Sequence, residues 1–247
     1  MNKIVFLVFS VVLYSCQQSS SIEENTLITD TLHTEVMTAD KQSNMSFNDV
    51  ISELKEGNLR FVENHMYRRN NVAQLEYLES GQHPKAVVLS CIDSRVPVEE
   101  VFDQGVGDLF VIRVAGNIDN DHNLASLEYG CKVSGAKVIV VLGHEYCGAI
   151  KSAVKGVDMG NITELLSHVQ PVLDKHEEFP GERTVDNPDF LELITKDNAL
   201  MTLDDIRAHS AILNSMEQED RIKLVAAYFD MGTGKILWLD EKDNPMH

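Results

Sequence analysis

Basic residues are scarce in this sequence. Its 247 residues include 21 Lys and Arg against 39 Asp and Glu, which gives a formal net charge of −18 at pH 7. Binding of nucleic acid needs a clustered basic surface, so this charge excludes a nucleic-acid partner. Cysteine is also scarce, with four in the chain, and none of them stands in the Cys-x-x-Cys spacing that is typical of thiol–disulfide proteins.

The N-terminus lacks an apolar run long enough for a membrane span. Residues 4–14 form an apolar run of eleven, which suits the core of a signal peptide and is too short to cross a bilayer. The run ends in Leu13-Tyr14-Ser15-Cys16, which resembles the lipobox of bacterial lipoproteins, where the cysteine is lipidated and becomes the new N-terminus. We therefore expect a signal peptide over residues 1–15 and a lipid on Cys16. A signal peptide that is cut nearby, with Cys16 incidental, is the alternative.

A polar segment separates this signal from the rest of the chain. Residues 17–44 are rich in Ser, Thr, Glu and Asp and show no sustained hydrophobic period. We interpret residues 16–45 as the lipidated cysteine with a flexible tether, and residues 46–247 as one domain. The protein would then be exported and anchored to a bacterial membrane, facing the periplasm or the cell surface, with no membrane contact besides the lipid.

The domain alternates helical and strand patterns. Ser46, with Asp49 three residues later, predicts a capped helix start. Strands buried on both faces are short and nearly all apolar, and a hairpin joins two such runs through a Gly-rich turn. Strands are thus predicted at residues 86–90, 109–114 and 137–142, a helix at 123–133, and an edge hairpin at 223–229 and 235–239. This order predicts an α/β fold with a mainly parallel β-sheet flanked by helices.

Two of the predicted strands end in residues that commonly bind metals. Cys91 follows one strand, and His144 and Cys147 follow another. Reactive groups in parallel sheets gather beyond the carboxyl ends of the strands, so these three side chains can converge. Two thiolates and an imidazole suit zinc, and three protein ligands leave a fourth position for water or substrate. Cys91 and Cys147 could instead form a disulfide in an oxidising compartment. Cys131 lies on the apolar face of a predicted helix, and we expect it to be inert.

These motifs resemble the β-class carbonic anhydrases. The sequence Cys-x-Asp-Ser-Arg at residues 91–95 is followed by Gly-His-x-x-Cys-Gly at 143–148, and the resemblance runs from about Ser46 to Leu239. Further matching segments are residues 54–61, 81–85, 102–104, 107–113, 115–117, 126–129 and 228–234.

The resemblance implies a zinc enzyme that reversibly hydrates carbon dioxide to bicarbonate and a proton, by attack of zinc-bound hydroxide. One Zn²⁺ per subunit would be held by Cys91, His144 and Cys147. Asp93 and Arg95 match the catalytic dyad of the family, in which Asp93 would orient the hydroxide and Arg95 would hold Asp93 away from the metal. The resemblance also implies an N-terminal helix that packs on a neighbouring subunit, in a homodimer or tetramer.

Within the family, the sequence is more similar to the plant-like members. Some bacterial members have an aspartate-closed site and carry a tryptophan three positions before the first ligand cysteine, where this chain has Val88. Gln82 stands where plant-like members carry a glutamine that could donate to bicarbonate. Phe110 and Tyr129 match aromatic residues that line the pocket from across the dimer interface, and the backbone N–H of Gly148 is a candidate oxyanion donor. We therefore expect an open site. One departure is Val114, where many members carry asparagine.

Three other functions remain open at this point. A hydrolase of the same fold could act on carbonyl sulfide or carbon disulfide, since selectivity there depends on pocket shape. A zinc-binding or bicarbonate-sensing protein could be catalytically silent, although the intact Asp93 and Arg95 pair argues against it. A thiol–disulfide protein would use Cys91 and Cys147. If the protein is a carbonic anhydrase, two thiolate ligands should make its bound water less acidic, so that activity rises toward mildly alkaline pH.

Overall fold

The computed structural model describes residues 32–239, so the predicted signal peptide and Cys16 lie outside the described residues. Within them, five strands form one sheet in the order β2-β1-β3-β4-β5. All neighbours pair in parallel except β4 and β5, which are antiparallel. The strands are β1 (Ala86–Ser90), β2 (Leu109–Arg113), β3 (Val138–His144), β4 (Lys223–Phe229) and β5 (Ile236–Leu239). The predicted mainly parallel sheet and its edge hairpin are confirmed.

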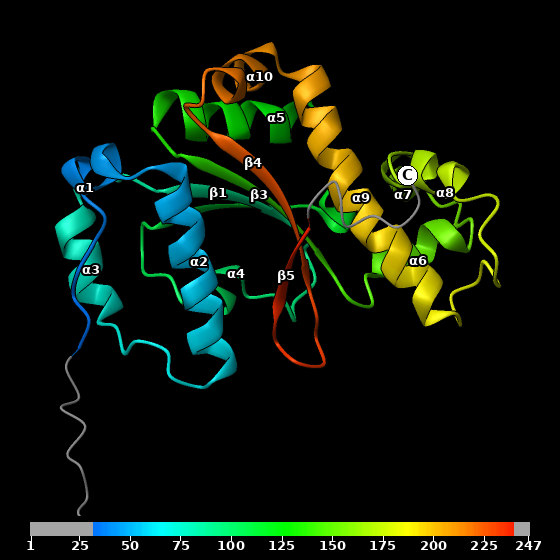
Figure 1. Ribbon diagram of the computed structural model, residues 1–247, viewed down its shortest axis with the longest axis horizontal. Coiled ribbons are helices and arrows are strands. Elements are labelled where there is room, and N and C mark those ends of the chain that lie inside the picture. The colour runs from blue at the N-terminus through cyan, green and yellow to red at the C-terminus, as the bar shows by residue number, and fades with distance from the viewer. Residues whose placement is uncertain (1–31, 240–247) are drawn as a thin grey trace, which may run out of the picture. The chain divides into compact units, whose positions relative to one another are not determined.

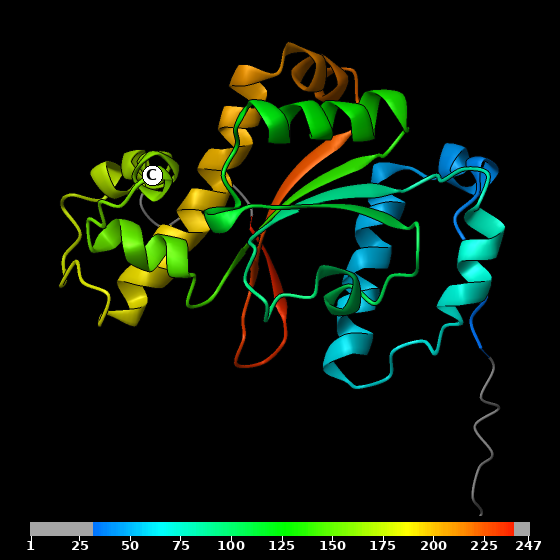
Figure 2. The same cartoon turned by 180° about the vertical axis from the view of Figure 1, so that it is seen from behind.

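Helices cover both faces of this sheet (Figures 1 and 2). Alternate residues of β1 explain why, because Val87 and Leu89 belong to one buried cluster and Val88 belongs to another. The first face is covered by α5 (Asp121–Glu128), the π-helical turn η2 (Tyr129–Val133), α9 (Pro188–His209) and α10 (Ala211–Gln218). The second face is covered by α2 (Phe47–Val62) and α4 (Val98–Val101). Strands buried on both faces must be apolar throughout, and this is the pattern that the sequence displays.

Helix α2 begins as predicted. The side chain of Ser46 accepts a hydrogen bond from the backbone N–H of Asp49, and the carboxylate of Asp49 accepts one from the N–H of Ser46. Val50 and Leu54 are fully buried against the sheet of the same chain. The expected packing of an N-terminal helix on a neighbouring subunit stays a prediction, because the structure contains a single chain.

The last part of the predicted tether is folded. Residues Ala39–Asn44 form helix α1, which the side chain of Thr38 caps. Gln42 is only 8% exposed, and its Nε2 donates hydrogen bonds to the carbonyls of Pro84 at 2.7 Å and Ser134 at 2.8 Å. The boundary at Ser46 is therefore too late. The sequence does not predict this helix, because its buried residue is Gln42 and it therefore shows no apolar periodicity.

The remaining helices are α3 (Asn71–Leu78), α6 (Gly148–Val154), α7 (Asn161–Ser167) and α8 (Gln170–Lys175), with a 3₁₀ turn η1 (Ala115–Asn117) after β2. The helix predicted at 123–133 is present as α5 followed by η2. In the part of the chain that the structure describes, none of the helices has the length and hydrophobicity needed to cross a membrane.

Candidate metal centre

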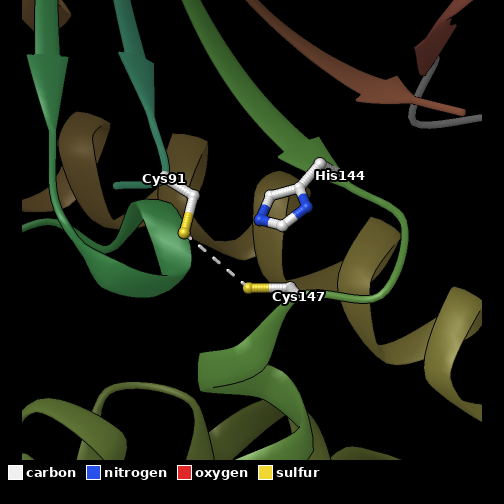
Figure 3. A group of neighbouring side chains, drawn as sticks. All are labelled: Cys91, His144 and Cys147. Carbon is white, nitrogen blue, oxygen red and sulfur yellow. Dashed lines mark hydrogen bonds between the residues drawn. The ribbon is translucent and has the colours of Figure 1, made fainter. Parts of the chain in front are cut away.

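The sheet itself brings three potential metal ligands together. Strands β1 and β3 are adjacent and parallel, with Ser90 opposite Leu142, so their carboxyl ends lie at the same edge. Cys91 directly follows β1, His144 is the last residue of β3, and Cys147 caps the start of α6. Figure 3 shows the three side chains pointing toward one another from these separate elements. Two apolar strands thus deliver ligands that lie more than fifty positions apart in the sequence, as the numbers of Cys91 and His144 show.

The distances fit a tetrahedral zinc ion. The sulfurs of Cys91 and Cys147 are 4.0 Å apart, and the possible ligand atoms of all three residues lie within 4.8 Å of one another. Zn–S bonds of about 2.3 Å at a tetrahedral angle require sulfurs about 3.8 Å apart. A disulfide would need a separation of about 2.05 Å. Both cysteines are free thiols, which removes the predicted disulfide alternative for this structure.

The imidazole of His144 is oriented for binding a metal through Nε2. Its Nδ1 lies 2.9 Å from the carbonyl oxygen of Glu145, which can only accept, so Nδ1 carries the proton. Nε2 is then an acceptor, and it is buried without a hydrogen-bond partner. Histidine ligands of metals commonly donate their other ring N–H to a carbonyl in this way. A buried acceptor with no partner costs free energy, and a bound cation would satisfy it.

The pKa values of the two thiols are shifted in opposite directions. A hydrogen bond from Cys147 lowers the pKa of the Cys91 thiol to about 4 against the effect of burial, and hydrogen bonds from the backbone of Gly116 and Asp93 also lower it. The sulfur of Cys91 raises the pKa of the Cys147 thiol, and burial adds to this. Of the two thiols, that of Cys91 is therefore the more acidic.

The third buried cysteine behaves differently. Burial alone raises the pKa of the Cys131 thiol to about 12, and its side chain packs in the apolar cluster under α9. A thiol with so high a pKa is a poor nucleophile and a poor metal ligand. The prediction that Cys131 is inert therefore agrees with its surroundings.

A strained turn connects His144 to Cys147. Tyr146 has a φ of 58°, in the left-handed region that a bulky side chain rarely adopts. Glu145 holds the turn on both sides, since its N–H donates to the carbonyl of Phe229 at 2.9 Å and its Oε2 accepts from the N–H of Met231 at 3.1 Å. The β4–β5 hairpin thus fixes this turn, and the turn brings the side chains of His144 and Cys147 close together.

Asp93 and Arg95 form an ion pair next to this cluster. Arg95 donates from Nε to Oδ1 at 2.9 Å and from a terminal nitrogen to Oδ2 at 2.8 Å, and its backbone N–H also donates to Oδ1 at 2.9 Å. The side chain of Asp93 is 16% exposed and that of Arg95 is 55% exposed. The hydrogen bonds from Arg95 hold the pKa of the Asp93 carboxyl well below its usual range, and the positive charge of the guanidinium lowers it further. Asp93 is therefore a carboxylate at neutral pH.

The chain also matches known proteins over most of this sheet. A family model described as "Carbonic anhydrase" matches residues 86–236, which is more than half of the sequence. Carbonic anhydrase of Synechocystis sp. is 31% identical over 202 residues, covering 77% of this chain and 71% of that protein. The chain belongs to the β-class carbonic anhydrase family.

Two further comparisons define the extent of the likeness. Carbonic anhydrase 2 of Mycobacterium tuberculosis is 44% identical over 110 residues, which is 44% of this chain and 53% of that protein. The chain thus spans about half the length of the first curated relatives that it matches. A solved tetrameric β-carbonic anhydrase of Sordaria macrospora has 25% sequence identity and a TM-score of 0.63, with 78% of this chain and 97% of that chain covered.

The residues predicted to line the substrate pocket do not all lie at this centre. Gly148, the first residue of α6, is adjacent to Cys147, and a side chain there would meet no atom within 4 Å. Gln82 is exposed in the loop before β1, and Phe110 lies opposite Val87. Val87 is four residues before Cys91, or about 13 Å along the strand.

Phe110 and Tyr129 are nevertheless neighbours. Their ring centroids are 6.2 Å apart in an edge-on contact, and Tyr129 is 55% exposed. Phe110 is therefore partly a packing residue, as its position in a strand suggests, whereas Tyr129 offers its ring to solvent. Gln82, Phe110 and Tyr129 thus lie toward the amino end of the sheet, away from the metal ligands of the same chain.

Sequence reasoning missed one polar residue at this site, Arg113. It is the last residue of β2, and its side chain contacts the turn that carries Cys91 and Asp93. The available signals were its place in the matching segment 107–113 and its charge at the carboxyl end of an otherwise apolar strand, where functional groups gather in parallel sheets.

Proposed function

We propose that this protein catalyses the reversible hydration of carbon dioxide to bicarbonate and a proton. The observation that carries the proposal is the convergence of Cys91, His144 and Cys147 at the carboxyl edge of the sheet, with the ion-paired carboxylate of Asp93 beside them. Membership of the carbonic anhydrase family supports it.

The three ligands would hold one Zn²⁺ per subunit. With three protein ligands, zinc keeps a fourth position for water and lowers the pKa of that water from 15.7 to about 7. The protein prepares the cluster for this ion in two ways. The backbone N–H groups of Ala149 and Ile150 lower the pKa of the Cys147 thiol and so partly offset the Cys91 sulfur and the burial that raise it, and the carbonyl of Glu145 holds the imidazole N–H of His144 at Nδ1, so that Nε2 presents its lone pair to the ion.

Asp93 is suited to orient the attacking water. Its Oδ1 accepts two hydrogen bonds from Arg95, whereas its Oδ2 accepts one. A carboxylate oxygen can accept two, so Oδ2 keeps a lone pair for the hydrogen of a water molecule. Accepting that hydrogen would turn a lone pair of the water oxygen toward the carbon of carbon dioxide. Arg95 keeps Asp93 ionised and holds its orientation, and the N–H of Gly148 is proposed to bind a bicarbonate oxygen.

The pocket would be completed by a second copy of the chain. Gln82, Phe110 and Tyr129 lie at the other end of the sheet from the metal ligands of their own chain. We propose that they contribute to the site of a partner subunit in a homodimer or tetramer. The relative from Sordaria macrospora is described as tetrameric, which supports an oligomer.

The test is stopped-flow carbon dioxide hydration by the purified protein, with its zinc content measured on the same sample. We expect about one zinc per chain and a rate that rises from pH 6 to pH 9 and vanishes when a chelator removes the metal. Carbonyl sulfide and carbon disulfide are assayed alongside. Faster turnover of either sulfur compound than of carbon dioxide would assign the protein to the rival hydrolase function, and zinc without any turnover would favour a silent binding protein.

We also propose export and lipid anchoring at Cys16, on the strength of the lipobox-like sequence at residues 13–16. The protein would face the periplasm or the cell surface. Labelling with a radioactive fatty acid in a bacterial host tests this, and Cys16→Ala should abolish both the label and membrane retention. Unchanged labelling of that variant would refute the assignment.

A further inference from the structure

Arg113 lies beside the turn at residues 91–93, which follows β1 and carries Cys91 and Asp93. It is the last residue of β2 and pairs in register with Ser90, the last residue of β1. The N–H of Val114 donates to the carbonyl of Ser90 at 3.0 Å, so the ends of the two strands are joined. From this position the guanidinium of Arg113 reaches the residues that follow β1.

The guanidinium binds two backbone carbonyls of this turn. Its Nε donates to the carbonyl oxygen of Cys91 at 2.9 Å, and a terminal nitrogen donates to the carbonyl oxygen of Asp93 at 2.5 Å. The planar guanidinium presents several donors in a fixed fork, so it can hold two carbonyls at once in one geometry. The contact therefore constrains the backbone between the metal ligand and the proposed orienting carboxylate.

Few other groups among the described residues bind the backbone carbonyls of this turn. Ile92, at its centre, is 61% exposed and does not anchor it in the core. The carbonyl of Asp93 also accepts from the N–H of Val96 at 3.1 Å, but among the hydrogen bonds of the described residues the carbonyl of Cys91 is held by Arg113. Arg95 cannot replace this contact, because it binds the carboxylate of Asp93 and leaves the two carbonyls alone.

We infer that Arg113 is a positioning residue, which sets the spacing between the sulfur of Cys91 and the carboxylate of Asp93 by clamping the backbone on either side of Ile92. The inference rests on the proposed function for its kinetic part, and on the metal centre alone for its binding part. Residues behind the direct ligands of a metal commonly change metal affinity or activity by 10- to 100-fold when they are replaced.

Three variants test the inference. Arg113→Met replaces the aliphatic part of the side chain with an unbranched apolar one and removes every N–H donor of the guanidinium. Arg113→Lys keeps the charge but cannot form the fork. Arg221→Met removes an arginine that is ion-paired to Glu219 on the surface, outside the site, and serves as the matched control. Zinc affinity is measured by competition with a chelator, the visible spectrum is recorded after cobalt substitution, and kcat and KM are measured for carbon dioxide hydration.

We expect Arg113→Met to bind zinc about 10-fold more weakly, to alter the cobalt spectrum, and to lose about 10- to 100-fold in kcat with KM nearly unchanged. Arg113→Lys should fall between this variant and the wild type, and Arg221→Met should match the wild type. Wild-type zinc affinity, spectrum and kcat in Arg113→Met would overturn the inference. If Arg113→Met does not fold, Arg113→Lys decides alone, and a wild-type kcat and spectrum in that variant overturn it.

The kinetic and zinc-binding measurements distinguish failure of the proposed function from failure of the positioning role of Arg113. A wild-type protein that binds zinc but does not hydrate carbon dioxide would refute the proposed function. Weaker zinc binding by Arg113→Met would in that case still support the role of Arg113 at the metal centre.

Discussion

The guanidinium of Arg95 donates two hydrogen bonds to the carboxylate of Asp93, from Nε to Oδ1 at 2.9 Å and from a terminal nitrogen to Oδ2 at 2.8 Å. The proposed mechanism needs both groups in this geometry, because it requires the carboxylate to stay ionised and to offer a free lone pair to the attacking water. The pair is not part of the ligand set. Its loss should therefore separate catalysis from metal binding.

Replacement of Asp93 by asparagine should leave the zinc content at the wild-type value and lower kcat/KM by about 100-fold or more, the usual contribution of a positioned proton acceptor. Asparagine preserves the shape of the side chain but presents an N–H₂ group at one of the two positions, and this group cannot accept a hydrogen. The measurement is stopped-flow hydration together with metal analysis. Retention of full activity by Asp93→Asn would show that Asp93 has a purely structural role.

Removal of the metal should weaken the fold as well as the activity. Without a cation, the buried Nε2 of His144 has no partner and the two sulfurs face each other at 4.0 Å. A metal that is present at about 1,000 times its Kd stabilises the native state by about 4 kcal/mol. For a domain of this size we expect the chelated protein to melt roughly 10 °C lower than the zinc-loaded protein.

Single cysteine variants provide the control for this measurement. Cys91→Ala and Cys147→Ala should lose the zinc-dependent part of the melting temperature, because two ligands hold zinc far more weakly than three. Cys131→Ala also removes a buried sulfur, so it should lower the melting temperature in both states while keeping the shift that zinc produces. A zinc-dependent shift in Cys147→Ala equal to that of the wild type would place the metal elsewhere.

The strands and the metal ligands were predictable because both have local signatures. A strand buried on both faces is a continuous apolar run, and a ligand follows directly where that run ends, as Cys91 does. Helix α9 was not predicted, although it covers the sheet. Its buried face includes Thr195, Asp197 and Asn198, so the apolar period is interrupted. Their burial is compensated by tertiary contacts such as that of Asn198 Nδ2 with the carbonyl of Gly116 at 2.8 Å, which no local pattern reveals.

The same limit explains why the contacts of Gln42 and Arg113 were missed. Gln42 and Arg113 donate hydrogen bonds to backbone carbonyls of residues that are distant in sequence. Every residue has a backbone carbonyl, so the sequence does not indicate which one accepts such a hydrogen bond. The positions of Gln82 and Phe110 relative to the metal ligands follow from strand register, which the motifs alone do not define.

Gly57 shows how packing can reverse a helix propensity. Alanine is about 1 kcal/mol more favourable than glycine in the middle of a helix. In α2, however, a Cβ at Gly57 would lie 1.8 Å from the carbonyl oxygen of Phe102. Because that atom is backbone, α2 or the end of α4 must shift. We expect Gly57→Ala to lower the free energy of unfolding by about 3 kcal/mol.

Urea denaturation measures this effect as a lower midpoint at an unchanged m-value. Gly81→Ala is the matched control, since a Cβ at Gly81 would meet no atom within 4 Å, and it should change stability by no more than about 0.5 kcal/mol. If Gly57→Ala proved as stable as Gly81→Ala, the close approach of α2 to Phe102 would be wrong.

The contact between His209 and Asp119 predicts a pH-dependent contribution to stability. Nδ1 of His209, at the end of α9, lies 2.9 Å from Oδ2 of Asp119, and this hydrogen bond raises the pKa of the imidazole, as do the charges of Asp205 and Asp121. His168 also faces Asp119, at 4.0 Å, and competes for its charge.

A pKa raised by folding means that protonated His209 favours the native state. Its contribution is therefore complete below the unfolded pKa of about 6.5 and is lost as the pH rises through the higher folded value. His209→Gln should accordingly lower the melting temperature more at pH 5.5 than at pH 8.5. In an Asp119→Asn background the difference between these pH values should shrink, because only the charges of Asp205 and Asp121 then remain to raise the pKa of the imidazole. A difference as large as in the wild-type background would mean that these carboxylates, and not Asp119, stabilise the protonated imidazole.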